Sequence, residues 1–332
     1  MFKKVYWHWF LLRINILLFI CTKAAFSQQI PTQKISYQDF DLKKGIDQVM
    51  TATYRADSTI TEPLSFTVLQ FNQQGELVND YTRILGTFGS ETVLQYLYKD
   101  GKIDSLNKKA SAKNFSTKSK FHYNATGFLD SITTKGFYVD YTDRFIIDKN
   151  NRIKMMERVY KKGYPGYKEH YQYDSNSKLK YSKIQKNGEP NLLTFYNGTD
   201  ELFSFEEGRD TLTVKITKKE VFKVYIGKMT IARAAEMRQQ YINNPEEFDR
   251  RTVKPLLKQA HFVYAVPANM VADSGEWVRR FVVDKSYRQK NNQLYLFRKY
   301  IYHDKHEVGS FDFSELFKMQ VEKRGLHKMI WD

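Results

Sequence analysis

FHYNATGFL occupies residues 121–129 and has the pattern of a β-hairpin. Its first and third residues, Phe and Tyr, are two places apart, which puts both rings on one face of a strand. Asn124 is a residue type that starts turns by bonding its side chain to nearby backbone, and Gly127 tolerates the positive φ that tight turns need. Leu129 then opens the returning strand. The stretch therefore predicts two antiparallel strands joined by a short turn.

The same unit occurs six times along the chain. An aromatic or aliphatic residue is usually followed by Asn or Asp, then by a turn, and then by an apolar residue six places after the first. The closing residues of successive copies are 26, 26, 24, 26 and 23 residues apart. The copies are Phe71–Leu77, Tyr98–Ile103 (one residue shorter), Tyr123–Leu129, Ile147–Ile153, Tyr173–Leu179 and Tyr196–Leu202.

A further apolar residue follows the closing one by three places in four copies, as Leu106, Ile132, Met156 and Phe205. An offset of three changes face in a regular strand, so we expect either a bulge or a two-faced sheet. A single hairpin is marginally stable in water, whereas stacked hairpins bury each other's apolar faces. The sequence therefore predicts a mainly β fold of tandem antiparallel β-hairpin repeats forming one extended or curved sheet, with a small helical block and a β segment at the C-terminus.

YQYDSNSKL at residues 171–179 resembles the YD repeat of Rhs-type bacterial proteins, whose pattern is roughly Y-x-Y-D-x-x-G-x-L. The stretch at residues 121–129 is similar to it as well. The resemblance covers about residues 66–206. It implies a β-rich strip or shell on the outside of a bacterium, and it brings no catalytic residues with it.

The N-terminus has the pattern of a signal peptide. Lys3, Lys4 and Arg13 supply positive charge, residues 14–21 are an apolar run, and residues 25–27 resemble a cleavage site, so we expect a signal peptide over residues 1–27. An uncleaved anchor and lipidation of Cys21 are the alternatives. Cys21 is the sole cysteine, and the cleaved chain would have no disulfide and no thiolate metal ligand. The expected location is exported: the periplasm, the outer surface or the medium.

Composition divides the rest of the chain into three parts. We expect an N-terminal capping segment at residues 28–64 with a short amphipathic helix over Tyr37–Thr51, a repeat domain at residues 65–227, and a C-terminal α+β region at residues 228–332. The last region is either a separate small domain or a helical insertion in a continuing sheet. Its expected helices are Ile231–Asn243, capped by Thr230, and Pro245–Gln259, and its expected strands are Glu276–Asp284 and Gln293–His303.

The net charge is +16. Such a chain attracts anionic partners, although lysines on solvent faces and edge strands also keep sheets soluble. The charge therefore favours an anionic glycan, the envelope surface or another protein as the partner, while export counts against a nucleic acid.

Tyrosines and lysines gather between the fourth and fifth copies. Tyrosine beside lysine suits stacking on sugars together with contact to anions. The alternative is that the tyrosines pack across neighbouring strands. The candidate binding residues are Tyr160, Tyr164, Tyr167, Lys161, Lys162 and Lys168.

The sequence contains no G-x-S-x-G elbow, P-loop, H-E-x-x-H or C-x-x-C motif. His303, Asp304 and His306 could ligate a metal, but a solvated turn explains them more simply, and we predict neither a metal site nor a cofactor. The function expected is that of an exported cell-envelope β-repeat protein, a structural or binding module for a glycan or protein partner. The alternative is an enzyme that acts on an anionic extracellular or envelope polymer, with a site near the C-terminal region.

Overall fold

The computed structural model describes most of the chain after residue 33. It covers residues 34–55, 63–85, 89–111, 115–161, 164–197, 200–209, 211–217, 220–225, 229–258, 262–286 and 292–311. The predicted signal peptide, and Cys21 with it, lies outside the described residues.

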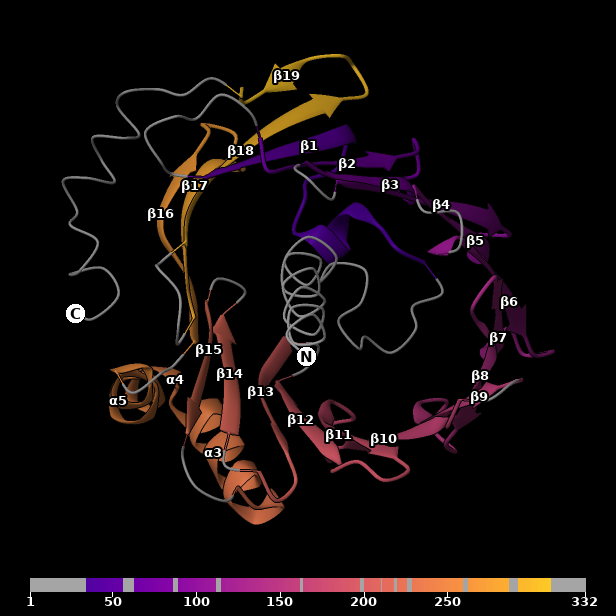
Figure 1. Ribbon diagram of the computed structural model, residues 1–332, viewed down its shortest axis with the longest axis vertical. Coiled ribbons are helices and arrows are strands. Elements are labelled where there is room, and N and C mark those ends of the chain that lie inside the picture. The colour runs from indigo at the N-terminus through magenta and orange to yellow at the C-terminus, as the bar shows by residue number, and fades with distance from the viewer. Residues whose placement is uncertain are drawn as a thin grey trace, which may run out of the picture.

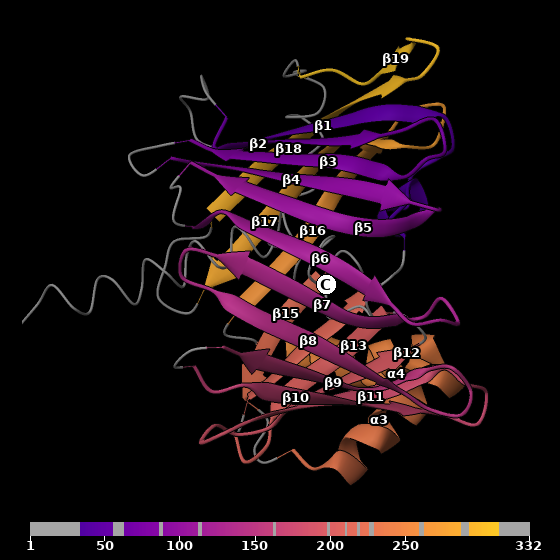
Figure 2. The ribbon, with the colours of Figure 1, turned by 90° about the vertical axis from the view of Figure 1, so that its right-hand side faces the viewer.

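One continuous antiparallel sheet contains the strands of these residues. β1 (Ile46–Arg55) pairs along one edge with β2 (Ser65–Phe71) and along the other with β18 (Asn292–Tyr302), so the ladder of pairings returns to its first strand. Figure 1 shows the sheet as a ring, and Figure 2 shows the strands tilted across its wall. The prediction of a mainly β fold in one curved sheet is confirmed. The repeat pattern does not predict the closure, because β1 and β18 lie outside the repeats.

The six predicted copies form the strands from β2 to β13, two strands to a copy. The closing residues Leu77, Ile103, Leu129 and Leu179 are all buried, and Ile153 is partly buried. The strands after β2 are β3 (Leu77–Ile84), β4 (Ser90–Lys99), β5 (Lys102–Ala110), β6 (Thr117–Tyr123), β7 (Leu129–Gly136), β8 (Asp140–Ile147), β9 (Ile153–Tyr160), β10 (Tyr167–Tyr173), β11 (Leu179–Lys186), β12 (Leu192–Asn197) and β13 (Asp200–Glu206).

A β-bulge lies at the same place in every copy. In the third copy Phe121 pairs with Ile132 and Tyr123 pairs with Leu129, so two steps along β6 face three steps along β7. The extra residue brings Leu129 and Ile132 onto one face, which explains the apolar offset of three. The register shifts of the six copies fall at Gln70/Phe71, Leu97/Tyr98, His122/Tyr123, Ile146/Ile147, Gln172/Tyr173 and Phe195/Tyr196.

The turns form as the residue types predict. Asn124 Oδ1 accepts hydrogen bonds from the backbone N–H groups of Thr126 and Phe128, at 3.1 and 3.0 Å, and Gly127 has a φ of 82°. Asp148 and Asp174 bond their turns in the same way. In the shorter second copy, Asp100 and Gly101 both have positive φ, as a two-residue hairpin loop requires.

The sixth copy closes one residue earlier than predicted. Tyr196 pairs with Glu201, and Leu202 is the extra residue of the bulge. Leu202 is nevertheless buried, in a core cluster that the helices complete.

The N-terminal segment is a short 3-10 turn followed by a strand, so the helix predicted over Tyr37–Thr51 is wrong. Only η1 (Tyr37–Phe40) is helical, and β1 begins at Ile46. Ile46 and Val49 are both buried although they are three residues apart, because a register shift between Ile46 and Gln48 puts them on one side. A bulged strand thus produced the spacing that resembles a helix.

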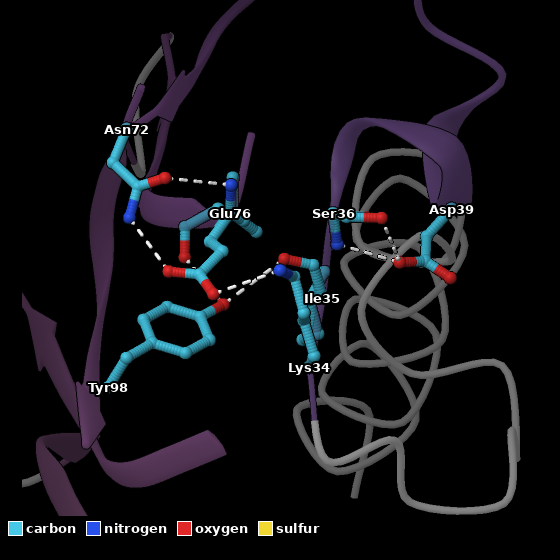
Figure 3. Close-up of polar contacts among 8 residues, drawn as sticks. Lys34, Ile35, Ser36, Asp39, Asn72, Glu76 and Tyr98 are labelled. Atoms are coloured by element: carbon cyan, nitrogen blue, oxygen red, sulfur yellow. Dashed lines mark hydrogen bonds and ion pairs between the residues drawn. The ribbon is translucent and has the colours of Figure 1, made fainter. Parts of the chain in front are cut away.

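Lys34 and Ile35 attach the N-terminal segment to the first repeat turn and to Tyr98, as Figure 3 shows. The Tyr98 hydroxyl donates to the carbonyl oxygens of Ile35 and Leu77, at 3.1 and 2.9 Å, and Lys34 Nζ lies 3.0 Å from Glu76 Oε1. Burial alone raises the pKa of Glu76, but hydrogen bonds from Asn72 and Lys34 outweigh it, and the net shift is downward.

The C-terminal strands continue the same sheet, and the helices lie between two strands that pair with each other, β15 and β16. Thr230 caps α3 by accepting a hydrogen bond from the Arg233 N–H, as predicted. A π-helical turn precedes Pro255, whose missing N–H and bulky ring disfavour a regular α-helix there. These elements are β14 (Thr211–Thr217), β15 (Glu220–Tyr225), α3 (Ile231–Asn243), α4 (Pro245–Phe248), η3 (Asp249–Val253), α5 (Lys254–Lys258), β16 (Phe262–Val271), β17 (Trp277–Ser286) and β19 (Glu307–Val308).

The two faces of the sheet bury different partners. The inner face carries Phe71, Tyr96 and Phe145, and near β1–β5 it packs around η1 inside the ring (Figure 1). The outer face of β12 and β13, with Phe195 and Phe203, packs against the helices. The outer face of β1, β17 and β18 also carries buried apolar residues, among them Ala52, Phe281 and Phe297, whereas over β4–β9 it is largely polar with single exposed apolar residues such as Leu97, Ile146 and Val159.

Candidate binding surface on the rim

Successive strands run in opposite directions, so their connections alternate between the two ends of the ring. The repeat turns lie at one end, and the connections from β5 to β6, β7 to β8 and β9 to β10 lie at the other. The described residues of these three connections are called the rim below: 110–111 and 115–117, 136–140, and 160–161 and 164–167. Figure 2 shows the strands that hold them side by side.

The structure divides the candidate residues between two faces and the rim. Tyr160 and Tyr167 lie on the inner face. They pair with Tyr141 and Arg158, which share a face with the inner residues Phe145 and Met156. Lys168 lies on the outer face, where its Nζ is 3.3 Å from Glu157 Oε1. Lys162 lies outside the described residues. The residues near Tyr160 and Tyr164 are therefore the part of the set that stays together at the rim.

Three tyrosines form a row that ends at the rim. The ring centroids of Tyr141 and Tyr160 are 5.4 Å apart, and those of Tyr160 and Tyr164 are 5.6 Å apart. Tyr164 is 62% exposed. Beside it, Lys161 Nζ lies 3.3 Å from Asp140 Oδ2. The tyrosines of the row pack across strands at its inner end, and the phenol ring of Tyr164 is exposed at its outer end.

Arg158 holds the inner end of this row in place. Its guanidinium donates two hydrogen bonds to the Asp143 carboxylate, at 2.7 and 2.8 Å, and its central carbon is 4.0 Å from the ring centroid of Tyr141 and 5.2 Å from that of Tyr167. Burial lowers the pKa of Arg158, but the Asp143 hydrogen bonds and charge more than offset this, and the net shift is upward. A bidentate pair between stacked rings fixes geometry as well as charge.

Glu169 is a buried carboxyl that sequence reasoning missed. It is 2% exposed, and its Oε1 has no hydrogen-bond partner among the described residues. Burial raises its pKa to about 7, although Ser182, Tyr171 and the charge of Arg158 act in the opposite direction. The signal was present in the alternation Tyr167-Lys168-Glu169-His170-Tyr171, which puts Glu169 on the face of the two tyrosines.

A second aromatic group on the rim was also missed. Phe115, Phe137 and Tyr138 are 62%, 74% and 54% exposed. The ring centroids of Phe115 and Tyr138 are 6.1 Å apart, and those of Phe137 and Tyr138 are 4.8 Å apart. These three residues are called the aromatic tip below. The available signal was an aromatic pair directly after Gly136 in a short connection between strands, where Gly, Asn or Asp is usual.

The histidines near the C-terminus belong to a turn. His306 Nδ1 lies 2.6 Å from Asp304 Oδ1, and His303 Nε2 lies 3.1 Å from the Asn72 carbonyl oxygen. In the ranges that the structure describes, no group of three or more His, Cys, Asp or Glu residues is arranged to hold a metal ion. Across the same ranges, no helix is both long and apolar enough to cross a membrane.

No family model and no curated protein matches the chain. Among solved structures, a porin-like protein from Bacteroides uniformis ATCC 8492 is 9% identical, with a TM-score of 0.33, over 77% of this chain and 97% of that one. The Photorhabdus luminescens Tc holotoxin pore (TccC3-D651A mutant) is 11% identical, with a TM-score of 0.33, and TcdB2-TccC3-TEV is 11% identical, with a TM-score of 0.22. The chain covers 74% and 78% of its own length in these two matches, but only 14% and 18% of theirs. Likenesses this distant do not bear on function.

Proposed function

We propose that this protein is an exported β-repeat module of the cell envelope that binds a glycan or a protein partner through its rim. The observation that carries the proposal is the tyrosine row from Tyr141 to Tyr164, which runs from the packed inner face to an open ring. A ring with an apolar face and a hydroxyl suits a partner that offers both C–H groups and hydrogen-bonding groups.

The scaffold supports this role because it holds the row at little entropic cost. Tyr141 is fixed by Arg158, which is itself fixed by Asp143. The strands on either side belong to one closed ladder, so the rim connections start from a rigid base. A pre-organised side chain loses less conformational entropy when it binds.

The charge near the row supports an anionic partner. Lys161 is exposed just after β9, and its ammonium forms an ion pair with Asp140, at 3.3 Å. A surface ion pair of this kind contributes little and can exchange for a charge on a partner. The overall charge of +16 acts in the same direction.

A glycan array, followed by capture from solubilised envelope fractions, tests the proposal. Tyr160→Ala/Tyr164→Ala should weaken binding of the best glycan or protein hit by about tenfold, since an aromatic contact contributes on the order of 1 kcal/mol. Leu97→Ala is the matched control, because Leu97 is 43% exposed but lies on β4, away from the rim.

The control should bind as the unaltered protein does. Equal loss in both variants, or a hit whose affinity ignores the tyrosines, would contradict the proposal. The alternative of an enzyme near the C-terminal region is not adopted, because no observation on the described residues favours it.

A further inference from the structure

The aromatic tip lies on the surface of the protein and not in its core. Phe137 and Tyr138 are the two central residues of a tight connection, closed by a 2.7 Å hydrogen bond from the Gly136 N–H to the Val139 carbonyl oxygen. These positions usually take Gly, Asn or Asp. Both rings are more than half exposed, so they contribute little to the core. Contiguous exposed apolar groups on a soluble surface usually mark a contact.

The sheet holds the tip together. A Cβ on Gly136 would lie 2.7 Å from the Ser116 carbonyl oxygen, so the two connections approach as closely as backbones can. This contact sets Phe115, on one connection, beside Tyr138, on the other. The three rings therefore form one unit on two adjacent hairpins.

The angles between the rings argue against a flat stacking platform. The planes of Phe137 and Tyr138 are 88° apart, and those of Phe115 and Tyr138 are 52° apart. A sugar ring or a base needs a flat face on which to stack. A wedge of rings at several angles needs only an apolar medium that can rearrange around it, such as the boundary between lipid head groups and acyl chains.

The charge beside the tip specifies what kind of surface fits. Lys118 and Lys135 lie directly opposite each other on β6 and β7, and both are exposed. Neither forms an ion pair with any residue that the structure describes, and the nearby Asp140 carboxylate is engaged by Lys161. Like charges directly opposite each other on a sheet are destabilising. An anionic surface would turn this cost into a favourable contact.

The lysines also limit the depth of insertion. Lys118 and Lys135 lie on the outer face, on the strand ends next to the tip. Lys120, two residues further along β6, pairs with Asp104. Charged side chains belong at the head-group level, while aromatic rings sit just below it. The arrangement fits shallow docking by the tip alone.

We propose that the aromatic tip docks this protein onto an anionic lipid bilayer, with the rings of Phe115, Phe137 and Tyr138 in the interface and Lys118 and Lys135 on the head groups. The inference uses none of the residues of the tyrosine row. It therefore stands whether or not the row binds a glycan or a protein.

Co-sedimentation with vesicles tests it. The unaltered protein should bind vesicles of phosphatidylglycerol mixed with phosphatidylcholine, and should bind phosphatidylcholine vesicles much more weakly. Phe115→Ser/Phe137→Ser should lose about tenfold or more in affinity, since two rings leave the interface. Leu97→Ser/Ile146→Ser is the matched control, because these residues are 43% and 47% exposed on the outer face, outside the rim. That control should stay within about twofold.

The lysines are tested in the same way. Lys118→Gln/Lys135→Gln should lower affinity for anionic vesicles and flatten its salt dependence. Lys149→Gln/Lys154→Gln, with the same charge change at the repeat-turn end, should not. Thermal unfolding of each variant checks that it is folded.

Three outcomes would overturn the proposal. They are failure of the unaltered protein to bind anionic vesicles, equal losses in the tip and control variants, and binding of a soluble anionic polysaccharide with the same dependence on Phe115 and Phe137. The last would assign the tip to a glycan instead.

Discussion

Tyrosine hydroxyls join neighbouring hairpins at the level of single residues. The opening Tyr123 donates to the carbonyl oxygen of Ile103, the closing residue of the copy before, at 2.7 Å. Tyr173 donates to Ile153 in the same way, at 2.9 Å, and Tyr98 donates to Leu77. The bulge leaves these carbonyls outside the regular ladder, and the hydroxyls satisfy them. The preference for Tyr over Phe at the opening position therefore has a physical cause that the sequence pattern alone does not reveal.

Glu169 makes stability depend on pH. Burial raises its pKa from the ordinary 4.5 to about 7 in the folded chain. The folded state therefore holds this proton more tightly than the unfolded state does. The stabilisation is complete below pH 4.5 and is lost as the pH rises through 7.

Glu169→Gln should remove this dependence. Relative to the variant, the unaltered protein should lose on the order of 3 kcal/mol of unfolding free energy between pH 4.5 and 8, as a shift of about two and a half pKa units implies. Urea titrations at both pH values measure it. Glu157→Gln, at a carboxylate on the outer face beside Lys168, is the control and should show no such trend. A parallel pH profile for unaltered protein and Glu169→Gln would contradict the account.

At the level of elements, each repeat is one hairpin with a bulge at the same place on its opening strand, and the first, third, fourth and fifth copies also share one kind of turn. The sequence predicts these hairpins well, because turn chemistry and the two-residue alternation are local. It fails where a bulge changes the period, as at Ile46 and Val49, where the spacing suggests a helix. It also misses the hairpin of β16 and β17, whose turn has the same hydrogen bonds from Ala272 to Glu276 but carries Ala at the first turn position, with Asp273 one place later.

Two glycines in these turns allow the cost of a left-handed backbone to be measured apart from the cost of a steric clash. Gly101 has a φ of 69° and open space around its Cβ position, whereas at Gly75 (φ 76°) a Cβ would collide with the ring of Tyr37. Gly101→Ala should cost about 1 kcal/mol, from the left-handed backbone alone. Gly75→Ala should cost more, because it also displaces the N-terminal segment. Denaturant unfolding of both variants measures the difference.

Tyr37→Ala supplies the control for this comparison. In that background the extra cost of Gly75→Ala over Gly101→Ala should shrink, since the colliding ring is gone. A cost for Gly75→Ala that is equal to or smaller than that for Gly101→Ala in the unaltered chain would show that the N-terminal segment does not rest on the first turn.

At the level of the whole molecule, the pairing of β1 with β18 closes the sheet and brings together strands near the two ends of the described chain. β1 lies between β2 and β18, so residues far apart in sequence share one ladder. Hairpin pairing is local and can be read from spacing, but pairing between distant strands depends on the summed twist and tilt of all the others. The rim has the same origin. The Tyr160 and Lys161 region is visible as a sequence cluster, whereas the aromatic tip exists only because two connections lie side by side.

Disulfide trapping across this closure is the most direct measurement of the central claim, that tandem hairpins form one sheet whose last strand returns to the first. Gln48 and Ile301 are paired residues of β1 and β18. In a Cys21→Ser background, Gln48→Cys/Ile301→Cys should oxidise rapidly to an intramolecular disulfide, because directly opposite Cβ atoms lie within about 5.5 Å. Gln48→Cys/Lys154→Cys should stay reduced. If the first pair fails to cross-link in the folded protein, or both pairs link equally, the ring does not exist in solution.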